Sequence, residues 1–426
     1  MDEAHVELDV TGIAHGGVGV ARDADGRVVF VADAIPGERV RAVVTESKKS
    51  FARATATEVL EASPDRVPHV WSEASIERDP ADRVGGAEFG HIRLERQRAL
   101  KAEVLADALT RFGGIRFSGD TPPFSGVPAR HAGETPEKGA GGLKRAEVEG
   151  VPGDDEADGL GWRTRVRLHV GAEGRPGPMA ARSHRVIPVE RLPLAAAGIE
   201  DVLAQEFEPG ERVQVIARGA EPPRLVVGDQ APSVITERVG EREFRVDDTG
   251  FWQVHREAPA VLVRAVREAI DPGRLDPDAP NLDLYGGVGL LASALADVGG
   301  SHTRVETVEA DPRASAHAAE NLADLPNAVA TAARVDRWVR SAPPAAEYAG
   351  ATIVLDPPRS GAGIETSRAV AGLGAAQLVY VACDPVALAR DTRTLAEHGY
   401  ALTRLRAVDL FPHTHHLEAI ATFLRD

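Results

Sequence analysis

A repeat of apolar strand, turn and helix in the C-terminal part of the chain is the feature that most restricts its fold. From about Glu241 onward it occurs in four stretches: NLDLYGGVGLLASALADV, TRVETVEADPRASAHAAENLADL, ATIVLDPPRSGAG and AQLVYVACDPVALARDTRTLAEHGY. Alternation of this kind predicts a parallel sheet covered by helices on both faces. Ligands bind such sheets at the carboxyl ends of the strands. We therefore expect an α/β domain over residues 241–426, with its site at those ends.

The chain before this repeat predicts two further parts. Short alternating segments between residues 4 and 60 predict a small β-barrel over residues 1–62. Residues 63–240 read as a central, mixed α/β domain, with a helix over 88–112 as a candidate for packing on the C-terminal domain and a proline-bearing helix candidate over 187–207. Residues 119–160 are rich in Gly, Pro and charge, which predicts a mobile insertion with little to bury.

Composition restricts the possible partners. The chain has no apolar run near the roughly 18 residues of a membrane span, so we expect no membrane helix. Its single cysteine predicts no internal disulfide and a reducing, cytoplasmic setting. A net charge of −16 argues against binding nucleic acid by bulk charge alone. Arginines nevertheless outnumber acidic residues between Arg163 and Arg191, which fits either a nucleic-acid patch or a solvated charged face.

A glycine turn follows the first strand of the repeat. Gly286, Gly287 and Gly289 come directly after the strand end at Tyr285 and let the backbone approach a ligand closely. The next strand ends at Glu309, where a carboxylate can accept both hydroxyls of a ribose. NAD and S-adenosylmethionine fit these residues equally. The third glycine of a dinucleotide turn is replaced by alanine at position 292, which favours a ligand without a pyrophosphate.

The third strand ends in Asp356-Pro357-Pro358-Arg359. Two consecutive prolines form a rigid shelf beside the ligand crevice, although a stiff turn is the simpler interpretation. The order of glycine turn, acidic strand end and Asp-Pro-Pro turn is typical of a Rossmann-like methyltransferase. An aromatic residue follows the prolines in members that methylate amines, and Arg359 stands in its place.

The only cysteine, Cys383, lies at the end of the next strand, where catalytic groups of α/β proteins gather. A buried cysteine is often only a small apolar residue, but the N-terminus of the following helix would favour a thiolate here. His413, His415 and His416 near the C-terminus lack the companions of a metal site, so we predict none.

A carboxylate base at Glu418 is the better interpretation of that C-terminal segment. Carbon 5 of uracil becomes nucleophilic only after a thiolate adds to carbon 6. A base must later remove the carbon-5 proton. A thiol, a carboxylate and a methyl donor are the groups that this reaction requires.

The sequence resembles the RNA uracil-C5 methyltransferase family, through DPPRSG with YVACDP, LFPHTHHLE and GFWQVH. The resemblance implies an N-terminal TRAM barrel, a central RNA-contacting domain and a Rossmann-like catalytic domain that binds S-adenosylmethionine and structured RNA. It implies that Cys383 is the nucleophile and Glu418 the base. The cofactor residues implied by the resemblance and the glycine turn are Gln253, Tyr285, Gly287, Gly289, Glu309 and Asp356.

Several positions depart from the family pattern. Some members carry an iron–sulfur cluster on four cysteines, but Trp71, Val84 and Ala87 stand at corresponding positions here, so we predict no cluster. Arg334 replaces a common acidic residue on the adenine side of the cofactor, and His255 replaces an asparagine. A serine that usually precedes the nucleophile is Ala382.

Two other functions fit parts of the sequence. A non-catalytic RNA-binding or chaperone protein could retain the same fold, and an NAD-dependent oxidoreductase could use the glycine turn. The residues leave open whether the RNA is ribosomal or transfer RNA. The N-terminal barrel slightly favours ribosomal RNA.

Overall fold

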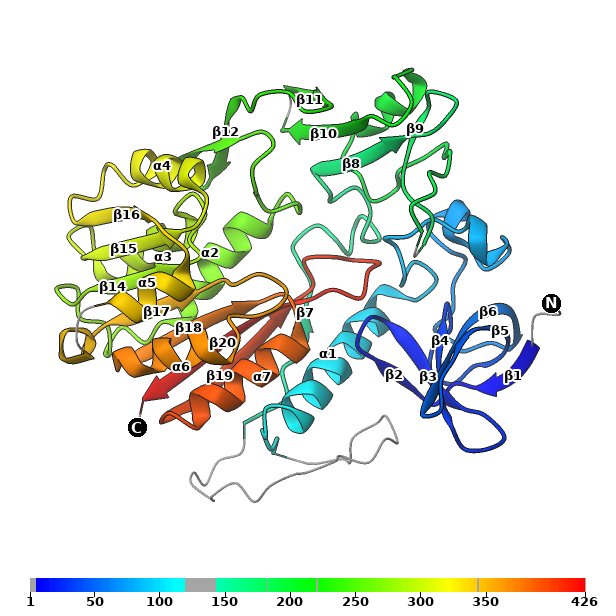
Figure 1. Ribbon diagram of the computed structural model, residues 1–426, viewed down its shortest axis with the longest axis horizontal. Helices are drawn as coiled ribbons and strands as arrows, with labels where there is room; N and C mark the ends of the chain where they lie inside the picture. The colour runs from blue at the N-terminus through cyan, green and yellow to red at the C-terminus, as the bar shows by residue number, and fades with distance from the viewer. Residues whose placement is uncertain (1–4, 119–142, 182, 220, 343–344, 426) are drawn as a thin grey trace.

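The computed structural model describes residues 5–118, 143–181, 183–219, 221–342 and 345–425. Its first part is a six-stranded sheet in the order β1-β5-β6-β4-β3-β2 (Figure 1). Strand β1 lies at one edge yet also contacts β3, so the sheet curls on itself as the predicted barrel requires. The strands are β1 (His5–Asp9), β2 (Gly12–Ala14), β3 (Val18–Arg22), β4 (Val28–Ala32), β5 (Arg39–Ser47) and β6 (Phe51–Glu61).

The central part holds a four-stranded sheet in the order β11-β10-β8-β9. A hairpin of β12 and β13 follows it, and Phe244 and Val246 of this hairpin pack in the core of the C-terminal part. These strands are β8 (Arg165–Val170), β9 (Pro176–Gly177), β10 (Arg212–Arg218), β11 (Glu221–Val227), β12 (Val234–Val239) and β13 (Arg242–Asp247). Short 3-10 turns occur at Ser72–Ala74, Pro80–Asp82, Ile199–Ala204 and Ala345–Tyr348.

The helix predicted over 187–207 is wrong. Only the single 3-10 turn Ile199–Ala204 forms there. Pro188 and Pro193 cannot donate helical hydrogen bonds. Gly198, just before the turn, has a φ of +82°, which is incompatible with a continuous right-handed helix.

The C-terminal part is built on an eight-stranded sheet in the order β16-β15-β14-β17-β18-β20-β19-β7. Neighbours from β16 to β18 pair in parallel, as the repeat predicts, whereas β20 is antiparallel to both β18 and β19. The strands are β7 (Val148–Glu149), β14 (Asn281–Leu284), β15 (Val305–Glu309), β16 (Ala328–Ala332), β17 (Thr352–Leu355), β18 (Gln377–Ala382), β19 (Tyr400–Val408) and β20 (Glu418–Arg425).

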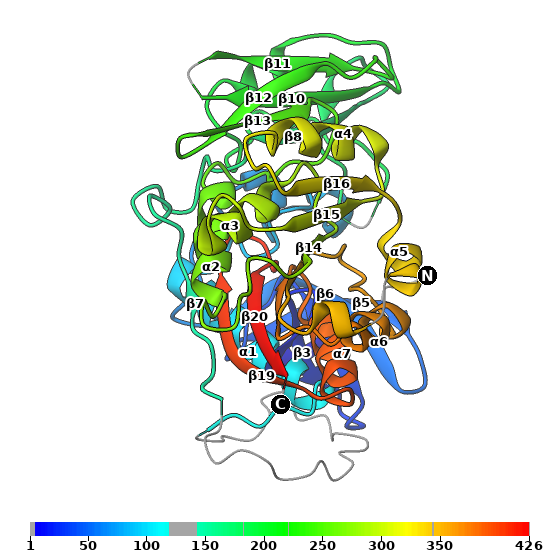
Figure 2. The ribbon, with the colours of Figure 1, turned by 90° about the vertical axis from the view of Figure 1, so that its left-hand side faces the viewer.

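Helices cover both faces of this sheet, and alternate strand residues supply two cores. Ile353, Leu355 and Tyr380 pack with α1, α5, α6 and α7, whereas Val354 and Val379 pack with α2, α3 and α4 (Figure 2). No helix of the described residues has the length and apolarity needed to cross a membrane. The helices are α1 (Leu94–Arg111), α2 (Ala258–Ala269), α3 (Leu290–Gly299), α4 (Pro312–Asn321), α5 (Val335–Ser341), α6 (Ile364–Leu373) and α7 (Pro385–Ala396).

Helix α1 comes from the central part of the sequence but packs against α7 of the C-terminal part (Figure 1). Leu105 and Leu109 of α1 are buried in the core beneath α7. Lys101 Nζ, also buried, donates to Asp409 Oδ1 at 2.6 Å just after β19. The helix begins at Leu94 rather than at residue 88.

Residues 143–160, which we predicted to be part of a mobile insertion, contribute to the folded C-terminal part. Strand β7 extends the large sheet by pairing in parallel with β19, and Val151 is buried. The sequence did not reveal this folded segment, because it is charged and rich in glycine and is held by a two-residue strand and the side chain of Val151. Residues 119–142 of the same prediction lie outside the described residues.

Candidate active site

The sheet brings the predicted catalytic residues to one edge. Tyr285, Asp356 and Cys383 each follow directly on the carboxyl end of β14, β17 or β18. Glu418 begins β20, which runs in the opposite direction, so its first residue meets the ends of the parallel strands. Ala382 pairs with Ala419, and the next position of this register sets Cys383 opposite Glu418.

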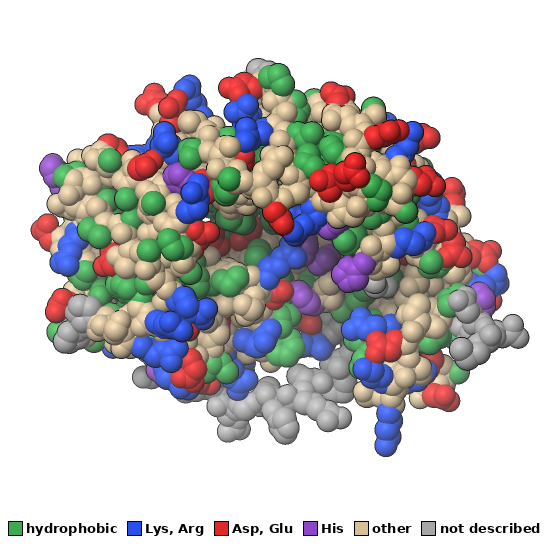
Figure 3. Space-filling model, turned by 45° about the horizontal axis from the view of Figure 1, so that its top comes forward, with side chains coloured by type: hydrophobic (Ala, Val, Ile, Leu, Met, Phe, Trp, Pro, Cys, Tyr) green, Lys and Arg blue, Asp and Glu red, His purple; other side chains and the backbone are tan. Residues whose placement is uncertain are grey.

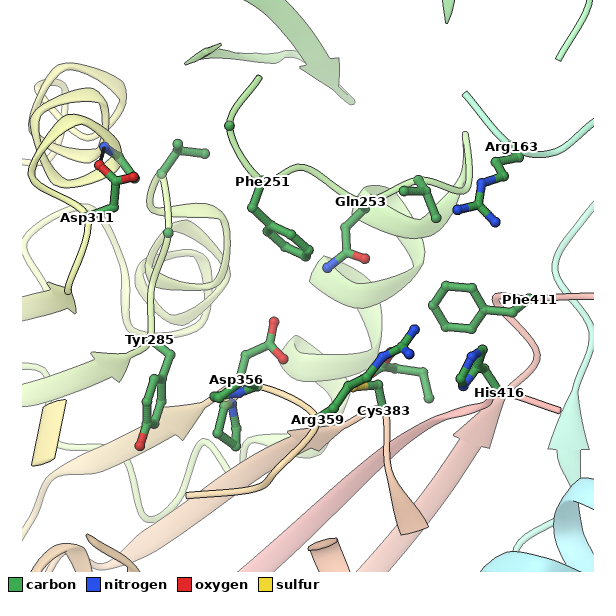
Figure 4. A pocket seen from close by; sticks show the side chains of 18 of the residues that line it. Arg163, Phe251, Gln253, Tyr285, Asp311, Asp356, Arg359, Cys383, Phe411 and His416 are labelled. Atoms are coloured by element: carbon green, nitrogen blue, oxygen red, sulfur yellow. Dashed lines mark hydrogen bonds between the residues drawn. The ribbon is translucent and has the colours of Figure 1, made fainter. Parts of the chain in front are cut away.

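These strand ends form the floor of a cavity of about 750 Å³ (Figure 4). Asp311 and Tyr285 lie at one side, Arg163, Phe411 and His416 lie at the other, and Asp356, Arg359 and Cys383 lie between them. Lys, Arg and His side chains gather around the hollow in this face of the molecule (Figure 3). Seven of the predicted site residues line the cavity: Gln253, Tyr285, Gly287, Glu309, Asp356, Cys383 and Glu418.

The glycine turn has little room for side chains. A Cβ at Gly286 would lie 1.8 Å from the hydroxyl of Thr307, so only glycine fits there. The N–H of Gly287 donates to Glu309 Oε2 at 3.0 Å. Gly289 is not among the described cavity-lining residues, in contrast to our prediction. Its φ of +90° and the close approach of Leu322 explain the glycine structurally.

Glu309 is well placed to receive hydroxyl groups. Its Oε1 accepts the N–H of Asp311 at 2.7 Å and its Oε2 that of Gly287, so backbone donors fix the carboxylate at the cavity wall. Each oxygen retains acceptor capacity for a further donor. The exposed aromatic ring of Phe251 and the half-buried ring of Tyr285 flank the same cavity. This carboxylate acceptor and the two aromatic rings fit an adenosine-containing cofactor.

Behind the glycine turn lies Asp283, a fully buried carboxyl that the sequence did not single out. Its Oδ2 accepts the N–H of Ala292 at 2.9 Å and the hydroxyl of Thr307 at 3.2 Å. Burial raises the pKa of Asp283 to about 7, with a smaller contribution from the charge of Glu309. Asp283 therefore ties the turn to the start of α3, and this carboxyl is neutral in mildly acidic solution.

We expect Asp283→Asn to stabilise the protein at pH 8 and to do so by a smaller amount at pH 5. Because the folded pKa lies above the unfolded value of about 4, the contribution of Asp283 to stability is complete below pH 4 and is lost as the pH rises through about 7. The expected gain at pH 8 is roughly 1–4 kcal/mol. Thermal unfolding at both pH values measures it.

Asp324→Asn is the control, because it is expected to change stability at neutral pH in the opposite direction. Its hydrogen bond with Arg242 lowers the pKa of Asp324, so removal of that charge destabilises at neutral pH. Equal effects of Asp283→Asn at pH 5 and pH 8 would contradict the assignment.

The surroundings of the Cys383 thiol favour its protonated form. Burial is the largest cause of the raised pKa, the charges of Glu418 and Asp356 add to it, Arg359 opposes it, and the resulting pKa is about 12. Our expectation that the helix N-terminus favours a thiolate is not met. Asp384 Oδ1 accepts the N–H groups of Val386 and Ala387, so this carboxylate already occupies the start of α7.

Two of the carboxyls that line the cavity, Glu418 and Asp356, act on the pKa of the thiol. Burial raises the pKa of Glu418 well above its usual range, and the nearby Asp356 adds to this. Burial likewise raises the pKa of Asp356 to about 7. Arg359 favours the charged form of Glu418 but does not offset its burial. In the absence of ligands, the raised pKa values therefore favour the protonated forms of Glu418 and Asp356.

Three cavity residues were not assigned a role from the sequence. Phe251 is 76% exposed and projects into the cavity beside Gln253 (Figure 4), although an isolated aromatic gave no signal. Arg359 extends from the Asp-Pro-Pro turn. Arg163 lies over the ring of Trp162, with its guanidinium carbon 5.8 Å from the ring centroid. Burial and the charge of Arg359 lower the pKa of Arg163.

The histidine-rich loop before β20 is held by hydrogen bonds. His413 Nε2 lies 2.7 Å from the carbonyl oxygen of Asp158, and its Nδ1 lies 3.1 Å from the side-chain amide of Gln97. His415 Nδ1 lies 3.5 Å from a carboxylate oxygen of Glu88. Among the described residues, no group of three or more His, Cys, Asp or Glu side chains is arranged to hold a metal ion.

The N-terminal sheet reaches the neighbourhood of Cys383 through the turn between β2 and β3. His15 Nε2 lies 3.2 Å from Asp384 Oδ2, next to Cys383 in the sequence. A Cβ at Gly17 would lie 2.6 Å from the Cβ of His415 and 2.9 Å from the ring of Phe89. The turn thus packs directly on the loop that leads to Glu418.

Gly17→Ala is expected to destabilise the protein by about 1–3 kcal/mol more than Gly16→Ala. Both glycines have a positive φ, so both substitutions have a similar backbone cost, but a Cβ at Gly16 meets no atom within 4 Å. Thermal unfolding of the two variants measures the difference. Equal losses of stability in Gly16→Ala and Gly17→Ala would indicate that the turn does not pack against the loop that contains His415.

The positions that depart from the family pattern have structural partners. Trp71, Val84 and Ala87 lie together in a buried apolar cluster. Arg334 pairs with Asp336 at 3.1 Å and is not among the described residues that line the cavity.

His255 joins the Gln253 segment to residues 143–160. His255 Nε2 lies 3.1 Å from both carboxylate oxygens of Asp154, and its Nδ1 accepts the N–H of Glu257. Its ring stacks on Trp162 with the planes 14° apart. We therefore assign His255 a structural role.

The arginine-rich stretch does not form a uniform patch. Three of its arginines form ion pairs with acidic side chains: Arg165 with Glu237, Arg185 with Asp82 and Arg191 with Glu200. Arg163, Arg167 and Arg175, by contrast, form no ion pair with any described residue. Of these three, only Arg163 lines the cavity.

Comparison with known proteins gives consistent matches. A family model described as tRNA (Uracil-5-)-methyltransferase matches residues 317–425, and a TRAM domain model matches residues 4–57. A protein of Streptomyces avermitilis, described as an uncharacterized RNA methyltransferase, is 36% identical over 97% of each chain. The 23S rRNA (uracil(1939)-C(5))-methyltransferase of Alkalilimnicola ehrlichii is 33% identical over 99% of this chain and 96% of its own.

A solved structure extends the likeness to the whole fold. The tRNA (uracil-54, C5)-methyltransferase of Pyrococcus abyssi, in complex with S-adenosyl-L-homocysteine, superposes with a TM-score of 0.65. The match covers 98% of this chain and 100% of that chain at 18% identity. At this identity the match supports the three-part architecture alone.

Proposed function

Because this chain belongs to the RNA uracil-C5 methyltransferase family, we propose that it methylates carbon 5 of a uridine in structured RNA through a covalent adduct between Cys383 and carbon 6. The observation that carries the proposal is the register of β18 and β20, which sets the thiol opposite Glu418 on the cavity floor. A nucleophile and a base are needed on one substrate ring, and cross-strand neighbours have the required proximity.

The reaction begins at the thiol. The sulfur of Cys383 bonds to carbon 6 as its proton leaves to a carboxylate of the cavity, and the electrons of the C5–C6 double bond move toward the carbon-4 carbonyl. S-adenosylmethionine supplies an electrophilic methyl group and a positive charge that favours ionised neighbours. After methylation Glu418 removes the carbon-5 proton, and the electrons of the C–S bond return to sulfur.

The other side of the cavity holds the cofactor. Glu309 accepts the ribose hydroxyls, and the N–H of Gly287 fixes that carboxylate. Gln253, Tyr285 and Asp356 complete the wall of this half of the site. These side chains are half-buried, and reduced access of water strengthens their interactions with a charged ligand.

We propose ribosomal RNA as the substrate in preference to transfer RNA. Support comes from relatives named 23S rRNA methyltransferases, which are 31% and 33% identical over 99% of this chain. The target uridine must leave its stack to enter the cavity, at a cost of a few kcal/mol. Contacts from the N-terminal sheet and from the arginines near the cavity would offset that cost.

Nucleoside analysis of RNA from cells lacking the gene tests the substrate. We expect 5-methyluridine to disappear from one site of 23S rRNA and to return with the wild-type gene. Loss from transfer RNA instead would overturn the ribosomal assignment. Binding of RNA by the purified protein, with no transfer of labelled methyl to any RNA of that cell, would favour a non-catalytic RNA-binding protein.

A further inference from the structure

A second cavity, of about 380 Å³, adjoins the catalytic one, and we propose that it binds an RNA nucleotide that flanks the target uridine. Gly86 and Arg163 line both cavities and form the wall between them. The RNA backbone joins the flipped uridine to its neighbouring nucleotide, so the backbone holds that nucleotide close to this region. This inference rests on the proposed function, because it assumes that a uridine of an RNA strand occupies the first cavity.

Strand β8 forms one side of the second cavity. Strand β9 pairs only with His169 and Val170 of β8, and the earlier residues Val166, Arg167 and Leu168 line the cavity instead. The opposite side comes from the segment between Pro178 and Ala181. The cavity is therefore a slot between parts of the central domain.

The walls combine apolar surfaces with positive charge. Apolar side chains suit the faces of a nucleobase, and those that line the slot are Trp71, Val166, Leu168, Met179, Leu192 and Leu194. Arg163, Arg167 and His169 are its basic residues, and none of its described lining residues is acidic. A lining without carboxylates in a chain of net charge −16 favours an anionic occupant.

One polar side chain at the slot is free to bind a ligand. Arg167 is exposed and makes no hydrogen bond or ion pair with any described residue. A phosphate of the RNA strand would pair with this arginine, while a base packs against the apolar walls.

A cycle that combines one protein variant with one RNA change tests the proposal. Ala181 is exposed at the slot, so Ala181→Trp fills it without altering the core. The RNA is a 23S rRNA fragment that contains the unmethylated target uridine. In a series of such fragments, one abasic nucleotide in turn replaces each of the three nucleotides on either side of that uridine. Equilibrium binding is measured for every pair, with Ala172→Trp, an exposed turn residue that is not among the described lining residues, as the matched control.

We expect one abasic position to weaken binding to the wild-type protein by about 10-fold, the effect of one lost stacked base. Ala181→Trp should weaken binding of the intact RNA to a similar extent and show no further loss with that abasic RNA. Ala172→Trp should behave as wild type. Additive losses in Ala181→Trp, or no abasic position with an effect, would overturn the proposal.

A second variant covers the case in which Ala181→Trp fails to fold. Arg167→Ala should weaken RNA binding by about 3- to 10-fold and reduce the slope of log affinity against log salt by about 1. An unchanged slope and affinity would count against a phosphate at the slot. Failure of the wild-type protein to methylate the intact RNA would instead contradict the proposed function, so the two failures are distinguishable.

Discussion

Cys383→Ala is expected to lower methyl transfer to uridine by at least about 10⁴-fold. Without the sulfur no bond forms at carbon 6, so carbon 5 keeps the poor nucleophilicity of an isolated uracil. The thiol is half-buried and its removal leaves the sheet intact, so the variant should retain its unfolding temperature. It should also bind S-adenosylhomocysteine as tightly as wild type. Methyl transfer is measured with labelled cofactor under single-turnover conditions.

A fluorinated substrate provides the direct readout. Fluorine at carbon 5 cannot leave as a proton, so RNA containing 5-fluorouridine should trap a denaturant-resistant complex with the wild-type protein and none with Cys383→Ala. The chain has only one cysteine, so peptide mass spectrometry identifies the attachment unambiguously. Undiminished methylation by Cys383→Ala would rule out the adduct mechanism.

Glu418→Gln is expected to stop turnover after the methyl group has been transferred. The carbon-5 proton then has no base, and the methylated ring stays bound to Cys383. We expect one equivalent of S-adenosylhomocysteine per enzyme, an accumulated protein–RNA complex with natural RNA, and a kcat lower by about 10²–10⁴-fold. Rapid-quench measurement of product, with gel analysis of the complex, tests each part.

Asp356→Asn is the matched control for Glu418→Gln. It removes the other carboxyl of the same cavity whose pKa is raised by burial. This variant should weaken cofactor binding but should not accumulate the methylated complex. If Glu418→Gln produced no S-adenosylhomocysteine in the first turnover, Glu418 would act before methyl transfer rather than after it.

Much of the catalytic edge was predictable because parallel strands bring their carboxyl ends together. The positions of Tyr285, Glu309, Asp356 and Cys383 followed from four strand–turn–helix repeats alone. Glu418 followed from chemical need, since a thiol mechanism requires a base. Its place opposite Cys383 depends on β20 running antiparallel, which an apolar strand pattern does not reveal.

The remaining features depended on contacts distant in sequence. The pKa of Cys383 was misjudged because the fold buries the thiol and brings the carboxyls of Glu418 and Asp356 close to it. The start of α7 is also already capped by Asp384. Gly289 was assigned to the cofactor, yet its conformation serves packing on Leu322. Residues 143–160 were predicted to be mobile because their own sequence has few apolar residues. Their order depends on the pairing of β7 with β19, which is distant in sequence.

The position of α1 limits how this enzyme can be rearranged. The helix belongs to the middle of the sequence, but Leu105 and Leu109 close the hydrophobic interior under α7, the helix that starts just after the nucleophile. Residues 241–426 expressed alone would leave that interior open to water. A chimera that exchanges the RNA-recognition parts of two relatives therefore has to keep α1 from the same protein as the C-terminal part. By this argument α1 belongs to the catalytic unit and not to the unit that selects the RNA.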